Sequence, residues 1–199
     1  MKRLRDFVVA ATRVMGPDGL DEADAHAKLG PLLRTLIASD DWLPPAFAEP
    51  DPVHYRQYLL HCDPLERFSV ASFVWGPGQK TPIHDHTVWG LIGILRGAEQ
   101  CRFFARKADG KLEAAGEERL EQGQLSTLGP QSGDIHEVAN AYADRVSVAI
   151  HVYGANIGAV ARHVFDPATG AIKNFVSGYA AAIQPNLWDR SADIRASLS

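Results

Sequence analysis

The chain has 199 residues, of which 46% are hydrophobic and 22% charged, so it is long enough for one domain that buries about 70% of its unfolded surface. A net charge of −4 and the lack of any Lys or Arg run exclude the basic surfaces typical of nucleic-acid or anionic-membrane binding, and favour a small-molecule partner. Two cysteines, Cys62 and Cys101, match no metal, redox or disulfide spacing, which indicates a reducing, cytoplasmic setting.

The N-terminal segment is basic and then apolar, but it does not resemble a secretion signal. Asp6 and Arg13 interrupt its apolar run and no small-residue cleavage site follows, so we expect it to remain in the mature protein. No stretch reaches the roughly 18 apolar residues of a membrane-spanning helix, so we expect a soluble protein. Helical spacing predicts a short amphipathic helix that ends at the turn 16–19 and is anchored by Leu4, Val8, Ala11 and Met15.

A second helix is predicted over 21–39, and Pro44 and Pro45 close the helical section. Its apolar positions keep a helical period at Ala25, Leu29, Leu32, Leu33 and Leu36. The stretch 50–64 is ambiguous. A third short helix there would be anchored by Tyr55, Leu59 and Leu60.

After residue 67 the chain changes to β-branched and aromatic runs separated by Gly, Pro and Asp turns, which predicts many short strands. We expect eight of them, which favours a mainly β barrel or jelly roll. Their expected ranges are 68–75, 82–86, 89–95, 99–106, 123–128, 135–139, 145–153 and 160–165. The expected organisation is one domain over 1–199, with a mostly helical part (1–66), a β-barrel (67–176) and a tail (177–199) in which 186–199 forms a short helix or frayed end.

Two histidine-containing motifs stand out. In GPGQKTPIHDHTVWG, His84 and His86 are two residues apart in a strand-like stretch, so their side chains leave the same face while Asp85 points away. Such a pair can also be an ordinary hydrogen-bonded pair. Fifty residues later, GPQSGDIHEVAN contains His136 in the pattern P-x-x-G-x-x-H-x-x-x-N, which ends at Asn140.

Together these motifs resemble the two signature motifs of the cupin superfamily. The resemblance covers most of 76–140 and implies a cupin β-barrel, a double-stranded β-helix, that follows the N-terminal α-helices. It also implies one metal ion held by two histidines of the first motif and one of the second, here His84, His86 and His136.

One departure from the general cupin pattern narrows the resemblance. The first motif usually carries a Glu ligand, and this chain has Gly90 near that place. Three neutral imidazoles leave the charge of a divalent metal uncompensated, which favours anionic substrate ligands. A three-His cupin without the Glu resembles the cysteine dioxygenase type I family of thiol dioxygenases, which implies Fe(II) as the cofactor, with O2 and a small thiol as partners.

The segment IHVYG extends this resemblance. In the family, the Tyr hydroxyl reaches the substrate side of the iron and the His orients it, roles that fall here on Tyr153 and His151. A Tyr that simply fills the barrel is the alternative. The family's Ser two residues before the His is replaced by Ala149, so its hydrogen bond is absent or comes from Ser147 or a water. Eukaryotic members crosslink a Cys to the Tyr, and Gly90 stands in its place, so we expect Tyr153 unmodified.

Two positions, Arg162 and Gln57, bear on which thiol is the preferred substrate. Arg162 lies in an otherwise apolar strand row, where it is either paired with an acidic residue or binds a substrate carboxylate, as in the 3-mercaptopropionate dioxygenase branch. Cysteine dioxygenases of mammals carry a carboxylate-binding Arg where the resemblance places Gln57, although a shift of one residue would put Arg56 there. We therefore expect 3-mercaptopropionate to be preferred over L-cysteine.

Three function classes remain open from the sequence. They are a thiol dioxygenase, a different metallo-cupin such as a Zn or Ni isomerase or lyase, and a ligand-binding cupin without catalysis. Tyr153, His151 and Arg162, together with the missing Glu, favour the dioxygenase. No feature indicates an oligomer interface, so a monomer and a homodimer both remain possible.

Overall fold

The structure is a computed structural model that describes residues 1–180 and 191–198. Two helices open the chain, α1 (Lys2–Val14) and α2 (Glu22–Ile37). The Asp21 side chain caps α2 by accepting a hydrogen bond from the backbone N–H of Asp24. Both predicted helices are therefore confirmed. Among the described residues, no helix has the length and apolar character needed to cross a bilayer.

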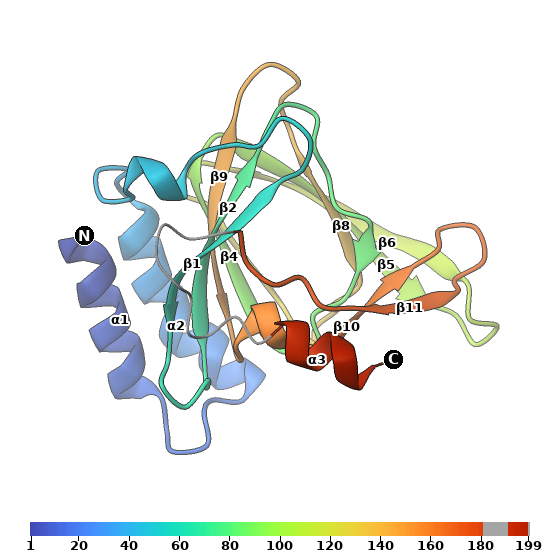
Figure 1. The fold of residues 1–199 in the computed structure, drawn as a ribbon, viewed down its shortest axis with the longest axis horizontal. Helices are drawn as coiled ribbons and strands as arrows, with labels where there is room; N and C mark the ends of the chain where they lie inside the picture. Colours follow the sequence, from blue (N-terminus) through green and yellow to red (C-terminus); the bar gives the residue numbers. More distant parts are fainter. Residues whose placement is uncertain (181–190, 199) are drawn as a thin grey trace.

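In the part of the chain that the structure describes, eleven strands form two antiparallel sheets that enclose the barrel interior (Figure 1). The first sheet has the order β1-β2-β9-β4-β7, with β1 Arg56–Cys62, β2 Ser69–Trp75, β9 Ser147–Tyr153, β4 Gly90–Arg96 and β7 Leu125–Leu128. The second has the order β11-β10-β3-β8-β5-β6, with β11 Ile172–Phe175, β10 Arg162–Phe165, β3 Ile83–His84, β8 His136–Asn140, β5 Ala98–Arg106 and β6 Leu112–Glu121. This mainly β architecture with N-terminal helices is the predicted cupin fold.

Short helical elements complete the fold. They are the 3-10 helices η1 (Pro45–Phe47) and η2 (Ile157–Ala159) and the C-terminal helix α3 (Ser191–Ser197). The expected short helix in the tail is thus present over 191–197, and the rest of the predicted stretch, 186–190 and 199, lies outside the described residues.

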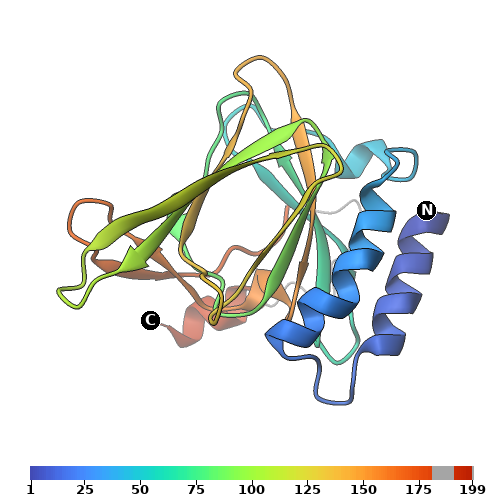
Figure 2. The ribbon, with the colours of Figure 1, turned by 180° about the vertical axis from the view of Figure 1, so that it is seen from behind.

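All eight predicted strands are present, and three more join them. The possible helix over 50–64 is wrong, because β1 lies there and pairs with β2 from Arg56↔Val74 to Cys62↔Ser69. The barrel therefore begins at Arg56, inside the part expected to be mostly helical. The other two additional strands, β6 and β11, are largely exposed and form the two opposite edges of the six-stranded sheet. Figure 2 shows β5 and β6 reaching far past the barrel as a long hairpin.

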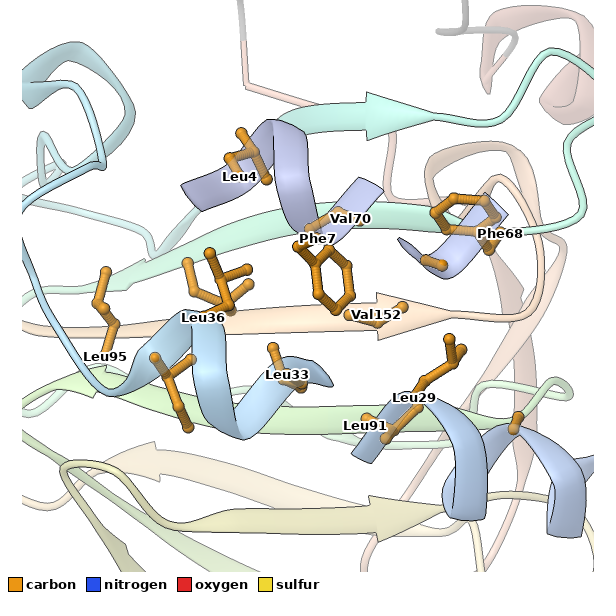
Figure 3. Close-up of a cluster of buried hydrophobic side chains, with 14 of the residues drawn as sticks. Leu4, Phe7, Leu29, Leu33, Leu36, Phe68, Val70, Leu91, Leu95 and Val152 are labelled. Carbon is orange, nitrogen blue, oxygen red and sulfur yellow. The ribbon is translucent and has the colours of Figure 1, made fainter. Parts of the chain in front are cut away.

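The helices cover the outer face of the five-stranded sheet. Leu29, Leu33 and Leu36 of α2 pack onto it, and Phe7 of α1 joins the same cluster with Val152 of β9 (Figure 3). Every residue of β2 and of β9 is buried, because the helices cover one face of these strands and the barrel interior covers the other. The helices therefore leave the metal-motif strands of the opposite sheet uncovered.

Asn140, at the end of the second histidine motif, has a structural role. The Asn140 side-chain amide donates hydrogen bonds to the backbone carbonyls of Trp75, Gly76 and Arg145, at distances of 2.8 to 3.1 Å. These bonds tie β8 to the end of β2 and to the loop before β9. Asn140 thus fixes the strand that carries His136 relative to the rest of the barrel.

Candidate metal centre and substrate pocket

The three histidines of the two motifs meet inside the barrel. His84 of β3 lies directly opposite His136 of β8, and His86 follows β3 by two residues. One ligand atom from each lies within 4.8 Å of the others, and all three side chains are buried. The predicted convergence of these residues is therefore present in the structure.

Hydrogen bonds select the protonation state of two of these rings. Nδ1 of His84 lies 3.1 Å from the carbonyl oxygen of Pro82, and Nδ1 of His86 lies 2.8 Å from a carboxylate oxygen of Asp134. Because both partners can only accept, each Nδ1 carries the proton and each Nε2 keeps its lone pair. This is the tautomer in which Nε2 can bind a metal.

Burial keeps the rings neutral. Desolvation, and to a smaller extent the Arg162 cation, lowers the pKa of His84 to about 4. Desolvation also lowers the pKa values of His86 and His136 well below the ordinary range, and the neighbouring imidazoles lower them further. Neutral imidazoles at neutral pH are the form that metals bind, so no proton has to be displaced.

The donor set fits a transition-metal ion. Within 1–180 and 191–198, these three histidines are the sole group of His, Cys, Asp and Glu side chains close enough to hold a metal. Nε2 of His136 is buried, and no described residue forms a hydrogen bond with it, as expected of an atom that serves a metal. Three imidazoles suit iron, zinc, nickel or copper, so the geometry supports a metal centre but does not select the metal.

A cavity of about 240 Å³ opens beside this centre. His84 and His86 line it on one side, and Tyr153 of β9 and Arg162 of β10 line it too. Phe73, Val164 and Phe175 add apolar walls, and the polar side chains of Gln57, Thr81 and Lys173 also line the cavity. A cavity that joins apolar walls to convergent polar groups has the character of a small-molecule site.

Arg162 is a buried cation, with only 3% of its surface exposed. Its Nη2 donates a 2.6 Å hydrogen bond to the Ser177 hydroxyl, and its guanidinium carbon lies 4.6 Å from the centre of the Phe175 ring. No carboxylate among the described residues forms an ion pair with it, and its buried Nε–H finds no acceptor there. Desolvation lowers the pKa of Arg162, because burial disfavours its charged form. The alternative of a structural ion pair is therefore not supported within that part of the chain.

The structure settles which of two neighbours faces the cavity on β1. Gln57 is buried and lines the cavity, and its Nε2 donates to the carbonyl oxygen of Gly178 at 3.1 Å. Arg56 faces outward and forms an ion pair with Asp51. The cationic side chain is thus absent from this wall, and a neutral amide stands in its place.

Tyr153 and His151 lie together as the IHVYG segment predicts. The Tyr153 oxygen is 2.8 Å from Nδ1 of His151. Desolvation raises the pKa of Tyr153, so its hydroxyl keeps its proton. No described residue forms a hydrogen bond with Nε2 of His151. The Ser147 hydroxyl is instead bonded to the backbone of Ala98 and to the side chain of Asn140. The suggestion that Ser147 replaces the missing Ser is therefore wrong.

An aromatic ring supports His151 instead. The Phe73 ring lies parallel to the His151 imidazole, with ring centres 4.0 Å apart. This contact fixes the plane of the imidazole without forming a hydrogen bond. On the other side of Tyr153, a side-chain carbon at Gly90 would lie only 3.0 Å from the Tyr153 ring. With glycine at that position, no sulfur is available there to modify Tyr153.

The sequence matches a known family. The sequence model described as Cysteine dioxygenase type I matches residues 32–175, which include every residue of the centre described above. The chain belongs to the cysteine dioxygenase type I family. Membership supports a thiol dioxygenase at the level of the family, which is a family of metalloenzymes, and agrees with the three-His centre.

Individual relatives are more distant. "Cysteine dioxygenase type 1" of Danio rerio is 26% identical over 117 residues, which cover 57% of this chain and 56% of the relative. The match thus spans about half the length of that protein. Among solved structures, a Klebsiella pneumoniae protein with a double-stranded β-helix domain is 15% identical, with a TM-score of 0.47 and coverage of 60% and 94% of the two chains. A cupin 2 conserved barrel protein of Salinispora arenicola is 19% identical, with a TM-score of 0.41 and coverage of 56% and 83%.

Sequence reasoning missed several residues of this family member's site. Asp134 lies inside the second motif, two residues before His136, so its position alone could have suggested a partner for a ligand. Phe175 is the last residue of β11 and Ser177 lies two residues beyond it, and both contact Arg162. β11 is largely exposed and has no alternating pattern of apolar residues. No local signal pointed to these two residues.

Proposed function

We propose that this protein is a mononuclear non-haem Fe(II) dioxygenase of small thiols that carry a carboxylate, with 3-mercaptopropionate preferred. The reaction would insert both atoms of O2 at sulfur and convert the thiol into a sulfinic acid. His84, His86 and His136 would hold the iron. Bound there, Fe(II) would supply a coordination site for the thiolate and the means to activate O2.

The observation that carries this proposal is the buried Arg162 guanidinium, which lines the same cavity as His84 and His86 and forms no ion pair with any carboxylate of the described residues. A buried cation costs free energy unless an anion meets it. A substrate carboxylate would satisfy it with charge-assisted hydrogen bonds from the planar fork. The ligand would then have its thiol at the metal and its carboxylate near Arg162.

Gln57 supports the preference for 3-mercaptopropionate. Gln57 is a neutral amide and donates one of its two N–H groups to the Gly178 carbonyl, so this residue offers a carboxylate no cation. L-Cysteine would also bring an ammonium group that must be desolvated, which 3-mercaptopropionate lacks. L-Cysteine is the second candidate, and the similarity to a protein named cysteine dioxygenase favours it.

Tyr153 and His151 would serve the reacting end of the substrate. The Tyr153 hydroxyl stays protonated, lines the cavity and lies beside His86, with ring centres 5.2 Å apart. It can therefore donate a hydrogen bond toward the substrate sulfur and oxygen, while His151 and Phe73 orient it. We also propose that the protein works in the cytoplasm, as a monomer or homodimer.

The test joins metal analysis of the purified protein to oxygen uptake with 3-mercaptopropionate, L-cysteine and cysteamine. We expect one iron per chain, consumption of O2 with formation of sulfinate, and the largest kcat/KM for 3-mercaptopropionate. A larger kcat/KM for L-cysteine would replace the substrate and keep the dioxygenase. Iron or zinc without oxygen uptake would favour another metallo-cupin, and no bound metal would favour a ligand-binding protein.

A further inference from the structure

Asp134 accepts three hydrogen bonds at the metal centre. One carboxylate oxygen lies 2.8 Å from Nδ1 of His86, and the other accepts from the backbone N–H groups of His86 and Thr87 at 2.8 and 2.7 Å. Only 10% of the Asp134 side chain is exposed. Both carboxylate oxygens thus accept hydrogen bonds, and all three donors lie on the segment that carries His86.

The other ligands have no such partner. His84 donates its Nδ1–H to the neutral carbonyl of Pro82. Asp85, although it sits between two of the ligands in sequence, turns away and bonds the backbone N–H and ring of His163. Within the described ranges, Asp134 is therefore the one carboxylate bonded to a ligand imidazole.

We infer that Asp134 is a positioning residue for the metal, which holds His86 in its metal-binding tautomer and places one negative charge behind this ligand. The inference rests on the metal centre of the proposed function. The three histidines are neutral donors, and the Asp134 carboxylate lies one hydrogen bond away from the ligand His86. A carboxylate bonded to a ligand imidazole also makes that imidazole a stronger donor.

Replacing the Asp134 carboxylate by an amide would change which hydrogen bonds it can accept. Asp134 presents an acceptor to three N–H groups at once, whereas an amide has one oxygen and one NH2 group. In Asp134→Asn, the amide oxygen would serve the two backbone N–H groups, and the NH2 group would face Nδ1 of His86. Nδ1 would then lose its proton to Nε2, and Nε2 would no longer offer a lone pair to a metal.

The experiment measures Zn(II) and Co(II) affinity of the full-length protein by competition with a chromophoric chelator. We expect Asp134→Asn to weaken binding by roughly 10 to 100-fold or more, and Asp134→Ala by less, because water can then accept from Nδ1. Asp85→Asn is the matched control, since it removes a neighbouring carboxylate that forms no hydrogen bond with a ligand histidine. The metal affinity of this variant should stay within about threefold of that of the original protein.

A second readout separates the tautomer from loss of structure. Nitrogen-15 NMR of the histidine rings should show His86 protonated at Nδ1 in the original protein and at Nε2 in Asp134→Asn, with circular dichroism confirming that both are folded. Unchanged affinity and tautomer in Asp134→Asn would overturn the inference, as would equal losses in the Asn and Ala variants with an unchanged tautomer. Failure of the original protein to bind either metal would instead overturn the proposed function.

Discussion

Arg162 and Glu99 are both buried, and neither forms an ion pair with another described residue, but they lie in very different surroundings. Arg162 lines the cavity beside the three histidines. Glu99 of β5 lies opposite Asn140, at the other end of β8 from His136, and is 0% exposed. No described residue forms a regular hydrogen bond with either of its carboxylate oxygens, although the nearby Trp75 indole slightly offsets its desolvation.

The contrast shows when an unpaired buried charge indicates a ligand. A guanidinium cannot give up its proton at any physiological pH, so Arg162 keeps its charge, and an anion bound in the cavity would stabilise it. A carboxyl group can become neutral, and desolvation raises the pKa of Glu99 to about 8. Glu99 therefore remains protonated at neutral pH and requires no ligand.

The largest effect is expected at the metal. Replacing His136 by Ala should remove most of the bound metal and of the activity, since a centre of three ligands has no spare donor. Replacing Glu99 by Gln should leave the metal content unchanged. Metal analysis of both variants tests whether the metal binds at the three histidines and independently of Glu99. Full metal occupancy in His136→Ala would contradict a metal centre at these histidines.

Removal of the Arg162 charge should come next. Arg162→Ala should cost on the order of 2–5 kcal/mol in kcat/KM for a thiol that carries a carboxylate, because that charge pair is buried. Cysteamine has no carboxylate, so its turnover should change much less. Steady-state oxygen uptake with both thiols checks this, and equal losses would show that Arg162 supports the fold rather than the substrate.

Glu99 should control stability rather than turnover. Its pKa of about 8 lies above the ordinary value of 4.5, so between these values the folded state binds more protons than the unfolded state and stability falls as pH rises. At pH 7 the cost is about 3 kcal/mol. In Glu99→Gln the free energy of unfolding should lack this slope. Urea unfolding of both proteins from pH 5 to 8.5 measures it, and parallel curves would place the pKa of Glu99 near its ordinary value.

Loss of the Tyr153 hydroxyl should slow turnover and leave the metal bound. A hydrogen bond to a charged partner contributes about 2 kcal/mol, so Tyr153→Phe should lower kcat by about 30-fold. The ring would still fill its place beside His86 and Phe73. Stopped-flow or oxygen-uptake kinetics with parallel metal analysis provide the measurement. Unchanged kinetics would assign Tyr153 to packing.

The smallest effect is expected at Ala149. Residues 149 and 151 share a strand face, so Ala149→Ser would offer a hydroxyl to the unbonded Nε2 of His151. We expect a tolerated change with activity raised by at most about threefold, since a neutral hydrogen bond contributes about 1 kcal/mol and Phe73 already orients the ring. A large loss of activity would mean that the added hydroxyl displaces Phe73.

The sequence by itself determined the parts of this protein that depend on local spacing. The His-x-His spacing predicted two rings on one face, although β3 ends at His84 and His86 lies two residues beyond it. The resemblance of the two motifs to those of cupins then implied the third ligand, His136, and the barrel. The helical periods of α1 and α2 were equally readable, since each helix buries a single face.

Only the tertiary structure decided which groups meet across the barrel. Arg56 and Gln57 are neighbours in sequence, and the pairing of β1 with β2 determines which one enters the cavity. Asp134 and His86 are 48 residues apart, and no spacing rule joins them. That no described carboxylate forms an ion pair with Arg162 likewise depends on every segment that packs around it. Such contacts depend on strand register and long-range packing, which a local pattern of residues does not specify.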